Sequence, residues 1–126
     1  MHKHAIETPA APAAIGAYSQ AVKAGNLVFL SGQIPLVPGT SEFAGDDIRT
    51  QVTQVFDNLQ AVASAAGGTL DQAVRLTVYL TDLAHFPVVN EVMSQVFAAP
   101  YPARATVQVS ALPRGALVEV DAILSL

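Results

Sequence analysis

The sequence predicts an α+β fold in one domain, with a single mixed β-sheet and two amphipathic helices packed on one face of it. Three observations support this fold class. The chain has 126 residues, which suffice for one hydrophobic core and leave little room for a second. Two segments have the apolar spacing of amphipathic helices, and five segments are rich in β-branched and other apolar residues. We therefore assign residues 1–126 to one domain with the order strand, strand, helix, strand, helix, strand, strand.

The first predicted elements are two strands joined by a tight turn. Residues 8–16 are rich in Pro and Ala, and Pro lacks the backbone donor that a sheet needs, so we expect an irregular lead-in there. Residues 18–23 and 27–31 flank Ala24-Gly25-Asn26, in which Gly and Asn tolerate the positive φ of a reversal. These two segments are predicted to form a hairpin.

The first helix is predicted over about residues 47–66. Its apolar side chains recur at steps of three and four residues, which places them on one helical face. They are Ile48, Val52, Val55, Leu59, Val62 and Ala66. Asp46 and Asp47 supply N-terminal capping carboxylates, and Gly67-Gly68 supplies a left-handed residue that ends the helix.

The second half of the chain is predicted to hold three strands and one helix. Residues 73–80 are almost continuously apolar, which suits a strand covered on both faces or within an oligomer. Residues 85–98 keep roughly helical apolar spacing, and Pro87 is tolerated in a first turn. Residues 103–109 and 117–124 flank a turn with Pro and Gly, and we predict that they form a final hairpin.

The composition indicates self-association. Hydrophobic residues make up 52% of the chain and charged residues 13%, so one small domain has difficulty hiding its apolar surface. The two helices also leave one face of the predicted sheet uncovered. Neighbouring subunits packed around a shared axis would cover that face and form clefts at their borders.

Charge and segment composition exclude several classes of protein. The net charge is −4, and the six Lys and Arg are scattered, so we expect no nucleic-acid partner. No apolar run approaches the roughly 20 residues of a membrane span, and no export signal is visible, so a soluble cytoplasmic protein is expected. The chain has no Cys, which excludes disulfides and thiolate chemistry. Three scattered His residues predict no metal site.

Arg104 and Glu119 are the first candidates for chemistry. Arg104 is the only charged residue between Glu91 and Arg114, and a guanidinium is well shaped to hold a carboxylate through two hydrogen bonds. Taken alone, it is explained more simply as an ion pair with Glu119 or Asp121 across the final hairpin. Glu119 interrupts an apolar run, where a carboxylate beside a cleft could hold a water, although a solvent-facing strand residue is the simpler interpretation.

Four further residues are weaker candidates. Ser31 and Gly32 end an apolar strand and could present a hydroxyl and an unhindered amide, although Ser-Gly is also common in turns. Tyr18 could offer its hydroxyl to a substrate or simply pack near a strand end. Asn90 lies among apolar residues of the second helix, where it points either at a cleft or at solvent. Sequence motifs for acyl-enzyme, nucleotide-binding and zinc-protease sites are absent from the chain.

Three blocks in order closely resemble the RidA/YjgF family of reactive-intermediate deaminases, over about residues 9–124. They are Ala14-Ile-Gly-Ala-Tyr-Ser-Gln-Ala21, Phe29-Leu-Ser-Gly-Gln-Ile-Pro35, and Pro102-Ala-Arg-Ala-Thr-Val107 with Leu117-Val-Glu-Val120. The resemblance implies a homotrimer of chorismate-mutase-like subunits, with helices outside, an inner barrel of sheets and three clefts between subunits.

The resemblance also implies an activity that needs no cofactor. Family deaminases hydrolyse 2-aminoacrylate, 2-aminocrotonate and their imine tautomers 2-iminopropanoate and 2-iminobutanoate to 2-keto acids and ammonia. Pyridoxal-phosphate-dependent serine and threonine dehydratases release these intermediates. By the motif match, Arg104 resembles the arginine that binds the substrate carboxylate, and Glu119 the glutamate that positions the attacking water with a backbone carbonyl near Thr106. Tyr18, Ser31, Gly32 and Asn90 match cleft positions.

Two departures from the family pattern bear on substrate preference. Many members have Cys at the position of Thr106 and Pro at the position of Ala17. Because the family uses the backbone at the Thr106 position, we expect activity to be retained, whereas Ala17 loosens the loop of Tyr18. The alternatives to the enzyme are a non-catalytic trimer that binds 2-keto acids, and a ribonuclease, against which the negative charge argues.

Overall fold

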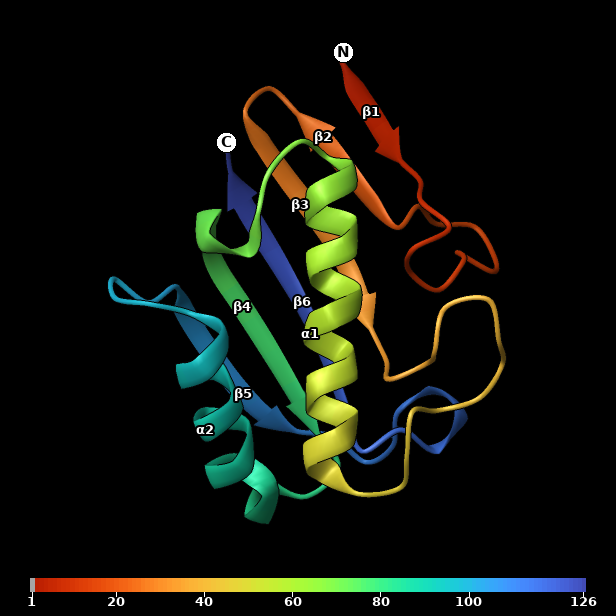
Figure 1. Cartoon of the computed structure of the whole chain (residues 1–126), viewed down its shortest axis with the longest axis vertical. Coiled ribbons are helices and arrows are strands. Elements are labelled where there is room, and N and C mark those ends of the chain that lie inside the picture. The colour runs from red at the N-terminus through yellow and green to blue at the C-terminus, as the bar shows by residue number, and fades with distance from the viewer. Residues whose placement is uncertain (1) are drawn as a thin grey trace.

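The computed structural model describes residues 2–126 as a six-stranded mixed sheet with two helices lying over one face (Figure 1). This architecture confirms the predicted fold class. The strands are β1 (Lys3–Ile6), β2 (Ala21–Ala24), β3 (Leu27–Gln33), β4 (Ala73–Leu80), β5 (Ala103–Gln108) and β6 (Val118–Ser125). The helices are α1 (Ile48–Ala65) and α2 (Phe86–Val96), and single 3-10 turns occupy η1 (Leu70–Gln72), η2 (Leu83–His85) and η3 (Pro113–Gly115). The strand order is β1-β2-β3-β6-β4-β5.

The predicted N-terminal hairpin is formed by β2 and β3, which pair antiparallel around Gly25 at φ +62°. Its first strand begins later than predicted, at Ala21. Just before it, the buried side chain of Gln20 anchors the irregular lead-in: its Nε2 donates to the carbonyls of Thr8 and Pro12 at 3.0 and 2.8 Å. Strand β1, which pairs with β2, was not predicted because its short polar sequence has no apolar alternation.

Helix α1 confirms the helix predicted from periodicity. Asp47 is the N-cap, and its side chain accepts a hydrogen bond from the Thr50 N–H at 3.0 Å. This hydrogen bond lowers the pKa of the Asp47 carboxyl. At the other end, Gly67 has a φ of +88°, as expected of a residue that follows a helix. Along the apolar face of α1, Val52, Val55, Leu59 and Val62 are completely buried in the core, and Ile48 at the start of the helix is partly buried.

The predicted final hairpin is wrong, because β5 and β6 do not pair with each other. Strand β4 lies between them, parallel to β5 and antiparallel to β6. Helix α2 connects β4 to β5 as a crossover, which brings β5 alongside β4 in the same direction. Strand β6 then fills the central position between β3 and β4, where its alternate apolar side chains are buried.

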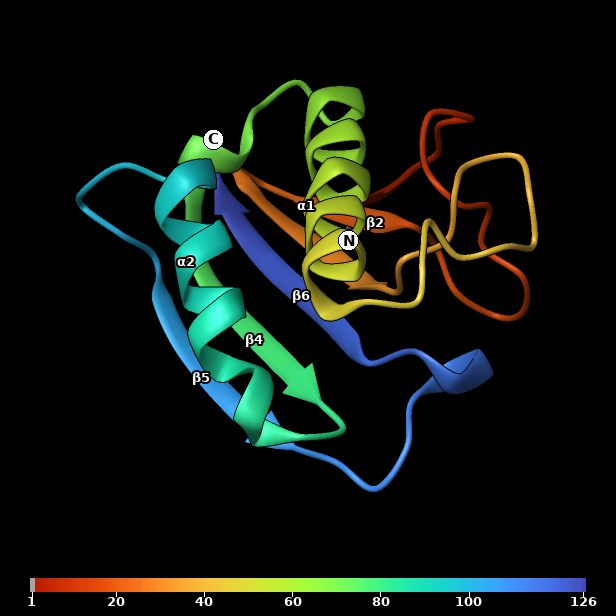
Figure 2. The same ribbon diagram turned by 60° about the horizontal axis from the view of Figure 1, so that its bottom comes forward.

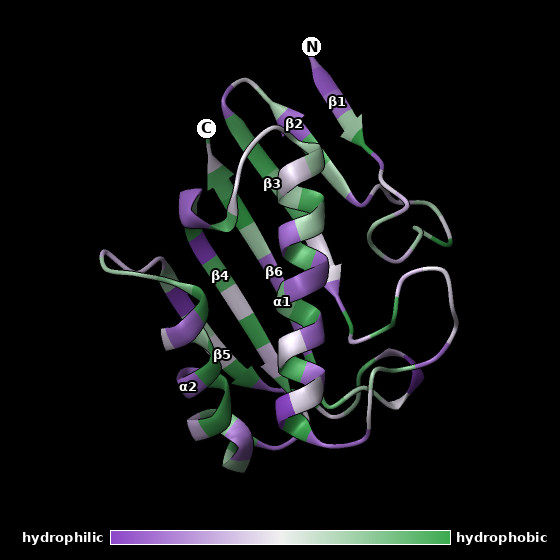
Figure 3. Cartoon of the chain, in the orientation of Figure 1, coloured by the Kyte–Doolittle hydropathy of each residue, from purple (hydrophilic) through white to green (hydrophobic). Residues whose placement is uncertain are grey.

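The two faces of the sheet differ in their cover, because both helices lie on one side of it (Figure 2), and α1 carries alternating bands of hydrophobic and hydrophilic residues (Figure 3). Helices α1 and α2 cover one face, against which Leu76, Val78 and Leu80 of β4 are completely buried. On the other face of β4, Thr77 and Tyr79 are only half-buried. That open face also exposes apolar side chains: Phe29 is 44% and Val107 is 41% exposed. Within residues 2–126, no helix is long and apolar enough to cross a membrane.

Candidate functional site

Arg104 lies on the helix-covered face of the sheet, beneath α2. Strand β5 pairs Arg104 with Leu76, whose side chain points toward the helices. One guanidinium nitrogen, Nη1, donates to Asn90 Oδ1 at 2.9 Å and to Met93 Sδ at 3.4 Å. The guanidinium carbon also lies 5.0 Å from the centroid of the Phe86 ring, a cation–π contact. Phe86, Asn90 and Met93 follow one another at intervals of four and three residues, which places them on one side of α2.

A cavity of about 350 Å³ adjoins this guanidinium. The Arg104 cavity, as we name it, is lined by Asn90, Met93, Ser94, Tyr101, Pro102 and Arg104. Residues 2–126 contain a single ion pair, Arg49 with Glu91, so Arg104 has no carboxylate partner among them. The interpretation of Arg104 as a structural ion pair with Glu119 or Asp121 is therefore wrong. Strand β4 separates them, and Arg104 lies on the opposite face of the sheet.

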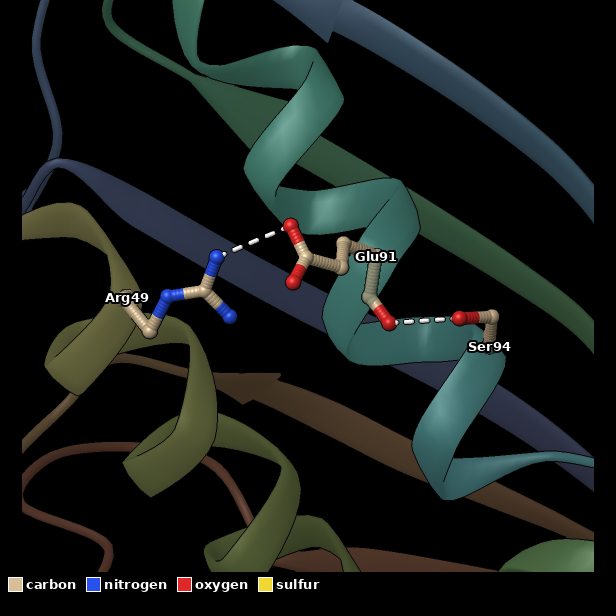
Figure 4. Close-up of polar contacts among 3 residues, drawn as sticks. All are labelled: Arg49, Glu91 and Ser94. Carbon is tan, nitrogen blue, oxygen red and sulfur yellow. Dashed lines mark hydrogen bonds and ion pairs between the residues drawn. The ribbon is translucent and has the colours of Figure 1, made fainter.

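Helix α2 carries one wall of this cavity and is tied to α1 at the surface (Figure 4). Arg49 Nη2 of α1 lies 2.9 Å from Glu91 Oε2 of α2. Ser94 Oγ donates to the Glu91 carbonyl at 2.6 Å. Both charged side chains are about half exposed, so the pair contributes little to the stability of the fold.

Glu119 lies on the open face of the sheet, on β6 directly opposite Tyr79 of β4. Burial raises the pKa of its carboxyl, and the neighbouring Asp121 charge raises it further. Asp121 in turn accepts a hydrogen bond from the Tyr79 hydroxyl at 3.1 Å. The pKa of Tyr79 is raised as well, first by burial and then by this contact.

Gly32 is the residue that allows the Glu119 carboxylate its position. A Cβ atom added at Gly32 would collide with the carboxylate oxygen of Glu119. The absence of a side chain at the end of β3 therefore leaves room for the carboxylate. Gly32, a weaker candidate from sequence, therefore lies against Glu119, a stronger one.

A second cavity, of about 240 Å³, lies at this end of the sheet. The Tyr18 cavity, as we name it, is lined by the lead-in, the end of β3 and the turn η3, with Ile15, Tyr18, Gly32 and Arg114 among its walls. Ser31 does not line it but supports it: Ser31 Oγ donates to the carbonyl of Ser19, beside Tyr18, at 2.6 Å. Tyr18 itself is 54% exposed.

The predicted site residues thus fall into two groups in one chain. Arg104 and Asn90 meet on the helix-covered face, while Tyr18, Ser31, Gly32 and Glu119 gather at the Tyr18 cavity and the open face. Thr106 belongs to the first group by its position two residues beyond Arg104 on β5.

The Thr106 hydroxyl has a distinctive environment. Its Oγ1 is buried and has no hydrogen-bond partner among residues 2–126. Buried hydroxyls are nearly always hydrogen-bonded in folded proteins. This oxygen therefore keeps hydrogen-bonding capacity close to the Arg104 cavity.

Sequence reasoning missed Phe86, Met93 and Tyr101 as neighbours of Arg104, and Arg114 as a wall of the Tyr18 cavity. The helical spacing of Phe86, Asn90 and Met93 indicated that these side chains share one face, so the contacts of Phe86 and Met93 could have been predicted together with that of Asn90. Nothing in the local sequence showed that β5 lies beneath that face. In the part of the chain that the structure describes, no group of three His, Asp or Glu residues could hold a metal ion.

Comparison with known proteins places these features in context. The model of a family described as endoribonuclease L-PSP matches residues 8–125. A 2-iminobutanoate/2-iminopropanoate deaminase of Dermatophagoides farinae is 43% identical over 122 residues, which cover 97% of this chain and 95% of that protein.

Solved structures agree with the whole fold. RidA from an Antarctic Psychrobacter has a TM-score of 0.94 and 50% identity, with 98% of this chain and 99% of that chain covered. TdcF of E. coli, solved with bound serine, has a TM-score of 0.92 and 39% identity, with 98% of each chain covered. The likeness therefore extends over both cavities and nearly the whole sequence.

Proposed function

We propose that this chain is an imine deaminase. The premise is that it belongs to the RidA/YjgF family, whose model is described as endoribonuclease L-PSP. Its substrates would be 2-iminopropanoate, 2-iminobutanoate and their enamine tautomers, and its products 2-keto acids and ammonia. One observation supports this most: a guanidinium with no carboxylate partner among residues 2–126 lines a cavity of small-molecule size. The Dermatophagoides relative named as a deaminase supports the reaction type.

The proposal requires assembly, because Arg104 and Glu119 lie on opposite faces of the sheet in one chain. We propose a homotrimer in which the open faces form the interior and the Arg104 cavity of one copy meets the Tyr18 cavity of the next. The exposed apolar side chains of the open face, Leu27, Phe29 and Val107, support this arrangement. Such contacts would bury surface that one chain leaves in water.

The chemistry proposed is hydrolysis by positioning. Arg104 holds the substrate carboxylate, so the imine carbon is presented to a water held by Glu119 and a backbone carbonyl near Thr106. The raised pKa of Glu119 makes its carboxylate a better proton acceptor for that water. Addition of water to the C=N bond gives a carbinolamine, and its collapse to C=O releases ammonia. Dehydratases that release imines from serine and threonine would supply the substrate.

The test is a coupled reaction with threonine dehydratase, in which semicarbazide traps the free imine. We expect the protein to lower the yield of trapped imine and to speed the release of 2-ketobutyrate, relative to dehydratase alone. Unchanged trapping at high protein concentration would contradict the proposal. The Arg104→Ala variant at the same concentration is the matched control.

A second candidate function is ligand binding without turnover. TdcF of E. coli has been solved with bound serine, so a relative with this fold holds a small carboxylate compound. Calorimetric binding of 2-ketobutyrate to a protein that leaves imine trapping unchanged would favour this function. RNA cleavage, which the family description names, is disfavoured by the net charge of −4.

A further inference from the structure

Arg114 is a second arginine that borders the candidate site, and the deaminase proposal gives it no role. It lies in the turn η3, between β5 and β6, and lines the Tyr18 cavity together with Tyr18 and Gly32. It also lines an adjoining hollow of about 550 Å³ that includes Ser41 and Glu42. Arg114 therefore borders both hollows.

The backbone at Arg114 is in a conformation that does not by itself favour arginine. Its φ of +60° and ψ of +19° are left-handed, and it is the one non-glycine residue with positive φ among residues 2–126. Glycine and asparagine adopt this region at lower cost than other residues. A long cationic side chain held in this conformation points to a role for the side chain itself.

The guanidinium of Arg114 has most of its hydrogen-bonding capacity free. Nη2 donates to the Ser41 carbonyl at 3.2 Å, and Ser41 lines the adjoining 550 Å³ hollow. Arginine has five N–H donors. No carboxylate of residues 2–126 forms an ion pair with it, although Glu42 lines the same hollow. An anionic group in the Tyr18 cavity would therefore meet an uncompensated positive charge.

We propose that Arg114 binds a second carboxylate, at the side-chain end of the substrate, and so selects 2-imino acids with an acidic side chain. This inference rests on the proposed function. Arg104 would hold the α-carboxylate, Glu119 would lie beside the imine carbon over Gly32, and the remaining atoms would extend into the Tyr18 cavity. That cavity, at about 240 Å³, holds several atoms of a side chain. A guanidinium binds a terminal carboxylate through two hydrogen bonds.

The test compares two substrates that differ by the terminal carboxylate, 2-iminoglutarate and 2-iminobutanoate, each generated in the assay by an amino acid oxidase. In Arg114→Gln, the ratio of kcat/KM for 2-iminoglutarate to that for 2-iminobutanoate should fall about tenfold, within the range for a hydrogen bond to a charged group. Arg114→Lys should retain most of the ratio, because it keeps the charge. Arg49→Gln, an exposed arginine outside both cavities, is the matched control.

A binding measurement separates this inference from the deaminase proposal. Calorimetry with the stable keto acids 2-oxoglutarate and 2-oxobutyrate should show an affinity loss of about tenfold for 2-oxoglutarate in Arg114→Gln. If the protein hydrolyses neither imine, the deaminase proposal fails, and this loss still supports Arg114 as the carboxylate subsite. An unchanged 2-oxoglutarate affinity, or an unchanged substrate ratio in an active Arg114→Gln enzyme, would overturn the inference.

Discussion

The Arg104 cavity and the Tyr18 cavity differ in how they are built and in what they hold. The first has walls from regular elements, α2 and β5, and holds a guanidinium with a fixed amide partner. The second is lined mainly by loops and lies beside a carboxylate whose pKa is raised. Groups on helices and strands are held more precisely than groups on loops. In the proposed reaction, the Arg104 cavity would hold the constant carboxylate end of the substrate rigidly, and the Tyr18 cavity would form an adaptable wall around its variable end.

The largest expected effect on activity comes from a substitution in the Arg104 cavity. Arg104→Ala should lower kcat/KM by about a hundredfold or more, because it removes the charged partner of the substrate carboxylate. Size-exclusion chromatography should show the same assembly as the unaltered protein, since Arg104 contacts no carboxylate within residues 2–126. Arg104→Lys keeps the charge but lacks the planar guanidinium, so its kcat/KM should lie between those of Arg104→Ala and the unaltered protein. Loss of assembly in Arg104→Ala would instead assign the residue a structural role.

Mixing two inactive variants tests whether the two cavities act across a subunit border. Arg104→Ala and Glu119→Gln should each be nearly inactive alone. Co-expressed at equal levels, they should recover activity at about a quarter of the sites, if three copies assemble at random in a cyclic trimer. The activity of purified mixed assemblies measures this recovery. A mixture as inactive as its parents would show that each site lies within one chain.

A smaller effect should follow from changing the charge near Glu119. Asp121→Asn removes the negative neighbour that raises the pKa of Glu119, so that pKa should fall. If ionised Glu119 positions the water, the acidic limb of the kcat/KM profile should move to lower pH. Tyr79→Phe, which removes the hydrogen bond to Asp121 and leaves the charge, serves as the control. An acidic limb at the same pH in Asp121→Asn would exclude Glu119 as the group that controls it.

The smallest effect concerns the support of the rigid cavity. Glu91→Gln breaks the exposed ion pair between α1 and α2 and should lower the free energy of unfolding by about 0.2–1 kcal/mol. Urea denaturation of Glu91→Gln, Arg49→Gln and the double variant gives the coupling energy of the pair. A coupling well above this range would mean that the pair holds α2 more firmly than its exposure suggests.

Local sequence was sufficient for most elements of the fold. The periodicity of α1, the turn at Gly25 and the apolar run of β4 each depend on neighbours along the chain, and the structure has them where expected. The pairing of β5 was missed because β5 and β6 look like a hairpin from their spacing alone. Their separation depends on a crossover and on long-range burial of β6, which no local pattern reveals.

In the candidate site too, local sequence predicts some features, and others depend on long-range structure. Residue types and motif spacing singled out Arg104, Asn90 and Gly32 as candidates, and in the structure Arg104 donates to Asn90 and Gly32 lies against Glu119. Arg114 was overlooked because its importance comes from a left-handed turn that folds back on the lead-in. The ion pair that Arg104 suggests when taken alone does not form for a related reason: the order of the strands places Arg104 away from Glu119 and Asp121.

The central place of β6 has a consequence for how the chain folds. It joins β1–β3 on one side to β4 and β5 on the other, and it is the last strand in the described sequence. Until β6 inserts, the sheet is two separate pieces, one beside each cavity. Pairings this distant in sequence form slowly. A nascent chain would therefore hold two unconnected groups of strands, and would lack Glu119, until its final strand emerged.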